Sequence, residues 1–90
     1  MKFLVLWEFQ SGIRGGLPEV AKLLTGLRAY ARELHKQRKL EHYYHVVGKH
    51  GGAWIFDVES NDELEILLAK MPVYNFVKHT IHPLTEMKTT

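Results

Sequence analysis

Cysteine is absent from this 90-residue chain. Its absence excludes disulfide bonds, cysteine-bound zinc and thiol catalysis, and it agrees with a reducing compartment. A surplus of one charge is nearly absent too, since 12 Lys and Arg residues stand against 10 Asp and Glu, a formal net charge of +2. So small a surplus argues against nucleic acid or an anionic membrane as a partner. No segment approaches the roughly 20 apolar residues that a membrane-spanning helix needs.

What the chain does contain is the composition of a globular domain, with 46% hydrophobic residues. Its length predicts one domain over residues 1–90, with a polar tail from about residue 86. The N-terminal apolar run from Phe3 to Trp7 stops at Glu8 and is too short for a signal peptide, so we expect a cytoplasmic protein. The unusual feature of the composition is its six histidines. Histidine is the side chain that titrates near neutral pH.

Hydrophobic periodicity predicts the element order β-α-β-β-α-β. The predicted elements are a strand at 2–10, a helix from Pro18 with an apolar stripe to Leu34, strands at 41–48 and 53–59, a helix opened by the capping box Ser60–Glu63, and a strand at 74–82 that Pro83 terminates. This order is typical of a ferredoxin-like α+β sandwich, in which two helices cover one face of a four-stranded antiparallel sheet. The glycine-rich segment 11–16 is predicted to be a loop and is a candidate lid over a cleft.

Two helices leave the second face of such a sheet uncovered. The first strand is nevertheless apolar in both phases, and the third has Trp54 and Phe56 on one side and Ile55 on the other. An exposed apolar face of this kind favours self-association. We expect a homodimer with the sheets face to face, a dimeric α+β barrel, or a larger ring. A monomer with a few exposed apolar residues is the alternative.

The stretch from Ile55 to Leu64 resembles the C-terminal half of the muconolactone Δ-isomerase family. The resemblance continues at Ile66-Leu67, Met71-Pro72 and Pro83-Leu84, and more loosely upstream at Arg28-Ala29, Ala31, Glu33-Leu34, Gln37, Lys39, His42 and Gly48. It implies a dimeric or ring-forming ferredoxin-like fold and a cofactor-independent isomerase of aromatic-compound catabolism. Members of the family move a proton within an unsaturated five-membered lactone that bears a carboxylate, giving the oxoadipate enol-lactone. The implied partner is a small lactone or cyclic carboxylate.

Two departures from the family fall in the expected pocket. The family carries glutamates in the middle of the first helix, where this chain has Thr25-Gly26-Leu27, and a tryptophan-rich second strand, where this chain has His42-Tyr43-Tyr44-His45. Histidine can supply a base without pKa tuning. We therefore predict His42 as the first candidate base, because it matches a family position and shares a strand face with Tyr44. His45 is the second candidate.

The remaining candidates are one further catalytic residue, Tyr44, and four residues that would bind the substrate. Tyr44 can donate a hydrogen bond to the developing oxyanion, and Arg28 can hold a carboxylate. Trp7 and Trp54 can line the pocket, with core or dimer packing as the alternative, and His50 is a further candidate. Each has a plain structural alternative, such as a solvated helix charge for Arg28.

The same residues allow other functions. The pairs His42/His45 and His79/His82 are three apart, and odd spacing on a strand sends side chains to opposite faces, so a metal site is expected only across strands or subunits. An RNA-recognition module has the same element order, but its glycine-aromatic signature is not met at 51–56. A catalytically silent relative that binds a small ligand or serves as an oligomeric scaffold is the remaining alternative.

Overall fold

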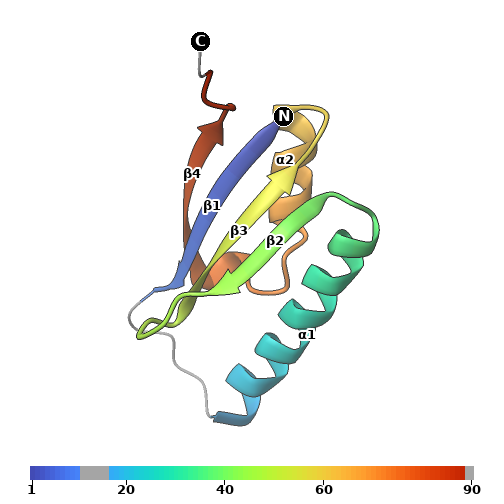
Figure 1. Cartoon of the computed structure of the whole chain (residues 1–90). Helices are drawn as coiled ribbons and strands as arrows, with labels where there is room; N and C mark the ends of the chain where they lie inside the picture. The colour runs from blue at the N-terminus through green and yellow to red at the C-terminus, as the bar shows by residue number, and fades with distance from the viewer. Residues whose placement is uncertain (11–16, 89–90) are drawn as a thin grey trace.

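The predicted element order is confirmed by a computed structural model, which describes residues 1–10 and 17–88 (Figure 1). The elements are β1 (Lys2–Phe9), α1 (Leu17–Lys36), β2 (Leu40–His45), β3 (Gly51–Asp57), α2 (Asn61–Ala69), a short 3-10 helix (Tyr74–Phe76) and β4 (Val77–Leu84). All strand pairs are antiparallel, in the order β2-β3-β1-β4. The segment 11–16, including the candidate lid, lies outside the described residues.

The hairpin between β2 and β3 is tighter than predicted. β2 ends at His45, and Val46 donates a backbone hydrogen bond to Gly51 across the turn at 3.0 Å. β3 already begins at Gly51, because the two glycines that were assigned to the turn pair with β1. A Cβ atom at Gly51 would lie 2.2 Å from the carbonyl oxygen of Trp7, so only glycine allows this approach of the two backbones.

The predicted capping of α2 is confirmed in its first half and shifted in its second. The Glu63 amide donates to the Ser60 Oγ at 3.1 Å. The Glu63 carboxylate accepts from the amide of Glu59 at 3.0 Å instead of reaching the amide of Ser60. Its other oxygen accepts from Lys39 Nζ at 2.7 Å, and this hydrogen bond lowers the pKa of Glu63 below its usual value. The start of α2 is therefore tied to the β2 side of the molecule.

The prediction that Pro83 terminates the last strand is wrong. Pro83 lies inside β4 opposite Phe3, and the strand continues to Leu84. β4 is an edge strand, so a residue without an amide hydrogen can be accommodated there. The strand also begins later than predicted, since Tyr74–Phe76 form the 3-10 helix.

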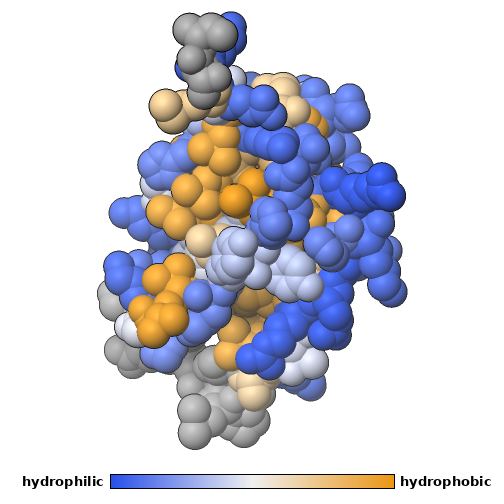
Figure 2. All heavy atoms as spheres, in the orientation of Figure 1, coloured by the Kyte–Doolittle hydropathy of each residue, from blue (hydrophilic) through white to orange (hydrophobic). Residues whose placement is uncertain are grey.

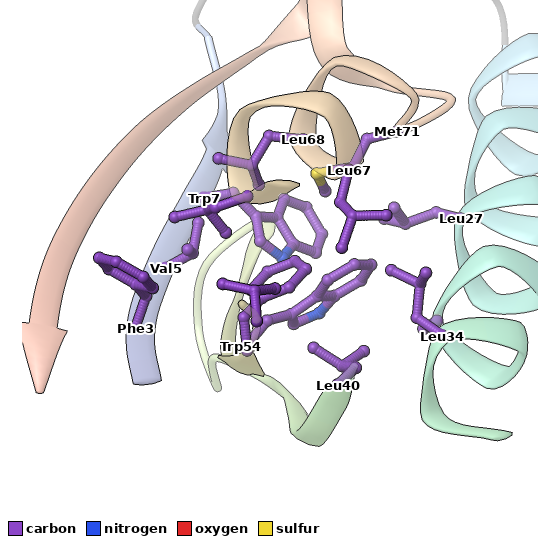
Figure 3. Packing of buried hydrophobic residues seen from close by; sticks show 14 of the residues in the cluster. Phe3, Val5, Trp7, Leu27, Leu34, Leu40, Trp54, Leu67, Leu68 and Met71 are labelled. Carbon is purple, nitrogen blue, oxygen red and sulfur yellow. The ribbon is translucent and has the colours of Figure 1, made fainter. Parts of the chain in front are cut away.

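Both helices pack on one face of the sheet and bury a single core (Figures 1 and 3). From the sheet this core takes Phe3, Val5, Trp7, Leu40, Trp54 and Phe56; from α1 it takes Leu27, Ala31 and Leu34; from α2 it takes Leu64, Leu67 and Leu68. Tyr30 adds a polar tie between the helices, because its hydroxyl donates to the carbonyl of Leu67 at 2.5 Å. Burial raises the pKa of Tyr30 to about 12, which keeps this hydroxyl protonated as a donor. No helix in the described ranges is long and apolar enough to cross a membrane.

Within residues 1–10 and 17–88, no helix lies over the other face of the sheet, as predicted. Figure 2, in the same orientation as Figure 1, shows apolar atoms gathered over its centre among polar ones. Leu6 is 37% exposed there, and Leu4 of β1 and Ile55 of β3 are half-buried and paired with each other across the strands. We call Leu4, Leu6 and Ile55 the open-face patch.

Candidate active site

A cavity of about 280 Å³ lies on the helical face of the sheet, between α1 and the strands β1, β3 and β2. We call it the α1 cavity. Its lining consists of apolar residues from α1, two tryptophans from the sheet and polar side chains: Leu24, Leu27, Arg28 and Ala31, then Trp7 and Trp54, then Tyr43, Tyr44 and His45. An apolar hollow with a few convergent polar groups is the usual form of a small-ligand site, and this volume suits a compact ligand.

Two indole rings form the inner wall of the α1 cavity. Trp7 of β1 and Trp54 of β3 meet edge to face, with ring centroids 6.0 Å apart and an interplanar angle of 83°. Figure 3 shows them between Leu27 and Leu34 of α1 and the residues at the end of α2. Trp7 is 7% exposed and Trp54 is 4% exposed, so both also belong to the core. The sequence left open whether these tryptophans line a pocket or pack in the core. In the structure both residues do both.

The Trp7 indole lies over Gly52, its partner residue on β3. A Cβ atom built at Gly52 would be 2.6 Å from the Trp7 Nε1 and 2.7 Å from two further indole carbons. Any larger residue at this position would therefore displace the ring. The Trp7 Nε1 is buried, and among the described residues it has no hydrogen-bond partner.

The polar side of the α1 cavity comes from the edge strand β2 and from α1. On β2, Tyr43 pairs with Trp54 and His45 with Gly52, which places both side chains on the helical face of the sheet. Arg28 lies one residue after Leu27 on α1, and it is exposed at the cavity's margin. Arg28 from the helix and His45 from the strand therefore both line the same largely apolar hollow.

His42 and Tyr44 lie on the opposite phase of β2 from Tyr43 and His45. Their rings stack with centroids 5.9 Å apart and an interplanar angle of 12°. Tyr44 contributes to the cavity lining although it is 57% exposed, because β2 is an edge strand and its side chains have no further strand beside them. His42 is exposed and does not line the cavity. The strand pairing thus confirms the prediction that His42 and His45 lie on opposite faces of the sheet.

His50 lies away from the α1 cavity, in the turn before β3. Its side chain is exposed, and its backbone carbonyl accepts a hydrogen bond from the amide of Phe9 at 2.9 Å. Within residues 1–10 and 17–88, no three His, Cys, Asp or Glu side chains are grouped closely enough to hold a metal ion.

A second hollow, of about 400 Å³, lies between α2 and β4. His79 is half-buried there, with its Nε2 3.4 Å from the sulfur of Met71 and its ring 5.7 Å from that of Tyr74. Burial lowers the pKa of His79 below 6.5. Burial thus favours the neutral imidazole, which lies against the thioether.

Two features of the α1 cavity were not found from the sequence. Tyr43 was not singled out, although its place beside His45 in the same phase of the strand could have indicated it. The unpartnered nitrogen of Trp7 was also missed. A strand glycine opposite a tryptophan could have indicated this buried nitrogen. The register that pairs Trp7 with Gly52, however, is known only from the structure.

The family model described as muconolactone delta-isomerase matches residues 1–89 of the chain. The chain belongs to the muconolactone Δ-isomerase family. A muconolactone Δ-isomerase from Acinetobacter baylyi is 41% identical over 51 residues, which are 57% of this chain and 53% of that protein. One from Cupriavidus pinatubonensis is 39% identical over 59 residues, 66% of this chain and 64% of that protein. The alignments thus span between half and two thirds of these relatives.

Solved structures of the same fold include a muconolactone isomerase at 3.3 Å resolution. It superposes with a TM-score of 0.89 at 18% identity, over 100% of this chain and 94% of that one. A 5-chloro-2-hydroxyhydroquinone dehydrochlorinase from Burkholderia phenoliruptrix, in complex with 2,5-dihydroxybenzoquinone, gives 0.77 at 17% identity, over 97% of this chain and 96% of that one. These likenesses confirm the ferredoxin-like α+β fold of this family member.

Proposed function

We propose that this family member isomerises a small unsaturated lactone that bears a carboxylate, and that the α1 cavity is the place of reaction. The reaction takes a proton from the ring carbon that carries the carboxymethyl group. The ring double bond moves one position away from the lactone carbonyl, and a proton is delivered to the carbon next to that carbonyl. The product is an isomer of the substrate, so the atoms balance without a cofactor, an oxidant or a reductant.

The observation that carries the proposal is the presence of Arg28 and His45 in one apolar cavity. The guanidinium of Arg28 can pair with the substrate carboxylate through two parallel hydrogen bonds. The imidazole of His45 can take up the proton, because histidine is both neutral and basic enough near pH 7 to act as a general base. The tryptophan wall offers an apolar surface to the lactone ring.

The choice of base follows from the position of the two histidines on β2. His42 is exposed on the phase of the strand that faces away from the cavity, whereas His45 lines it. We therefore assign the base to His45, and Tyr44, which also lines the cavity, to its rim. His50 has no part in this proposal because it lies outside the cavity.

Incubation with muconolactone in deuterated water tests the proposed reaction directly. Proton NMR should show the double-bond shift, with deuterium incorporated at the carbon next to the carbonyl. If neither shift nor exchange occurs with muconolactone or its methylated analogues, the isomerase proposal is wrong. Binding without turnover would instead indicate a catalytically silent ligand-binding relative, and salt-dependent binding to single-stranded RNA would favour the nucleic-acid module.

Self-association is proposed on a separate observation, the open-face patch. Leu4, Leu6 and Ile55 lie on the two central strands of the sheet, on the face that no helix of the described residues covers, and Figure 2 shows apolar atoms gathered on this face. A second copy packed on this face would remove the patch from water. Analytical ultracentrifugation should show a dimer or larger ring, and Leu6→Lys should shift the population toward monomer. A monomer at all concentrations would contradict this.

A further inference from the structure

The indole nitrogen of Trp7 is a buried donor without an acceptor among the described residues. Buried N–H groups in folded proteins nearly always have a partner, since an unpaired one loses its bond to water and gains nothing in return. A native protein that leaves one unpaired at the wall of a cavity keeps a hydrogen-bonding position free. The partner is then to be sought in what enters the cavity.

The strand register shows where this donor lies. Trp7, Gly52 and His45 form one row across β1, β3 and β2 on the helical face. The indole nitrogen occupies the space that a side chain at Gly52 would fill. Neighbouring strands are about 4.8 Å apart, so the nitrogen lies roughly one strand spacing from the backbone of His45. The donor and the proposed base therefore flank the same small volume.

We propose that the Nε1–H of Trp7 donates a hydrogen bond to the lactone carbonyl oxygen and stabilises the negative charge that this oxygen gains when the ring proton is removed. This inference rests on the proposed function. The proton removed from carbon goes to the imidazole of His45, and the indole keeps its own hydrogen throughout, so no bond of Trp7 breaks. A preorganised donor in a dry site is the usual means of stabilising such an oxyanion.

Access to the nitrogen requires a side chain of the cavity to move, since the nitrogen is buried in the unliganded chain. Tyr43 and His45 are both exposed and lie on the same side of the sheet, but the Tyr43 ring packs against His35 with centroids 5.5 Å apart, so His45 is the side chain that can turn outward at the smaller cost in packing. The competing arrangement is that the N–H stays buried without a ligand beside the ring of Trp54, whose centroid is 6.0 Å from that of Trp7. The two arrangements differ in whether the indole hydrogen responds to a ligand.

The test is the ¹H–¹⁵N spectrum of the indole groups, because the chain has only two tryptophans. Trp54→Phe assigns the two resonances. The probe is 5-oxotetrahydrofuran-2-acetic acid, a saturated lactone with the carbonyl and the carboxylate but no double bond to shift. The control is tetrahydrofuran-2-acetic acid, the same ring and carboxylate without the carbonyl. We expect a downfield shift of the Trp7 Nε1–H with the lactone and none with the ether.

Trp7→Phe keeps a ring in the wall and removes the donor, with Trp54→Phe as the matched loss of an indole from the same core. Trp7→Phe should lower kcat for muconolactone by about 100-fold with a small change in KM, the pattern of a transition-state contact. It should also reduce the preference for the lactone over the ether by roughly tenfold. Trp54→Phe should leave that preference in place. Thermal denaturation of both variants establishes that they fold.

The outcomes separate this inference from the proposed function. Turnover of muconolactone with no response of the Trp7 resonance, or with a normal kcat in folded Trp7→Phe, overturns the donor role and leaves the isomerase. A carbonyl-dependent shift without turnover supports the donor and overturns the isomerase. Failure of the saturated lactone to bind, together with no turnover of muconolactone, overturns both.

Discussion

The α1 side and the α2 side of the helical layer cover the same sheet face, yet they use their polar groups in opposite ways. α2 buries Leu64, Leu67 and Leu68, and its N-terminus is closed by Ser60 and by the ion pair of Glu63 with Lys39. α1 also buries a leucine stripe, but it leaves a cavity beside it. Trp7 lines that cavity and has a buried indole nitrogen without a partner among the described residues, and Arg28 and His45 line it as exposed residues.

The polar groups that stabilise the fold and those that are available for chemistry thus lie on different sides of the helical layer. Polar groups that are satisfied inside the protein add to stability, whereas groups left unpaired at a cavity are available to a ligand. In the hollow on the α2 side the polar group also has a partner inside the protein, because the imidazole of His79 contacts the sulfur of Met71. Substitutions on the α2 side should therefore change stability alone, and substitutions on the α1 side should change activity.

Among the residues that contact the side chains of the α1 cavity, Gly52 has the largest expected effect on stability. Gly52→Ala places a Cβ atom 2.6 Å from the Trp7 nitrogen and must displace the indole. Overpacking of this kind costs about 1–3 kcal/mol, and urea denaturation should show a loss at the upper end of this range. Gly26→Ala is the matched control, since its Cβ would lie at an ordinary 3.6 Å from Pro72 and should not destabilise the chain. Equal losses at both glycines would contradict the assigned packing.

Arg28→Ala should weaken substrate binding without unfolding the protein. Hydrogen bonds to a charged group contribute about 1.5–3 kcal/mol, so KM for muconolactone should rise by roughly 10- to 150-fold with a smaller change in kcat. Arg32→Ala removes another exposed arginine of α1 that does not line the cavity, and its kinetics should stay at the level of the parent chain. If the two variants behave alike in steady-state assays, Arg28 is a solvated helix charge.

Ser60→Ala tests the α2 side. It removes the oxygen that accepts from the Glu63 amide at 3.1 Å, and the loss of such a cap costs about 1 kcal/mol. Chemical denaturation should detect this loss while kcat/KM at 25 °C stays unchanged. A fall in kcat/KM without a fall in stability would mean that the two sides are coupled.

The smallest expected effect is the pH dependence due to His79. Burial lowers its pKa in the folded chain below 6.5, so the unfolded chain binds the proton more readily. The stabilising contribution of neutral His79 is therefore present above pH 6.5 and is lost as the pH falls through the folded-state pKa. His79→Gln should flatten the fall in melting temperature between about pH 7 and pH 5. An unchanged slope would assign the acid sensitivity to other groups.

The fold could be predicted from the sequence because each element carries its own local signal. The capping residues Ser60–Glu63 marked the start of α2, and the alternation in the first strand placed Trp7 with Phe3 and Val5 on one face. The expectation that Pro83 ends the last strand was wrong, because proline is tolerated in a strand at the edge of a sheet. Whether a strand lies at an edge is a property of the assembled sheet.

The site was harder to predict because it depends on one irregularity. The register shifts between Leu40 and His42, so that Leu40 is buried in the core while Tyr43 and His45, of opposite parity, share its face of the sheet. Strict alternation from Leu40 would have placed His42 and Tyr44 in the cavity. A β-bulge of this kind inverts which side chains face the helix, and single-sequence periodicity does not reveal it. The assignment of His50 to substrate binding stays a prediction without structural support.

The central claim is that the reaction takes place on the helical face of β2, at His45. The most direct measurement is the rate of muconolactone isomerisation by His45→Ala beside that of His42→Ala, in folded protein of the same oligomeric state. General-base catalysis contributes about 10²- to 10⁴-fold, so His45→Ala should lose at least 100-fold in kcat while His42→Ala loses no more than about threefold. A large loss in His42→Ala with near-parent activity in His45→Ala would contradict the claim and move the reaction to the open face of the sheet.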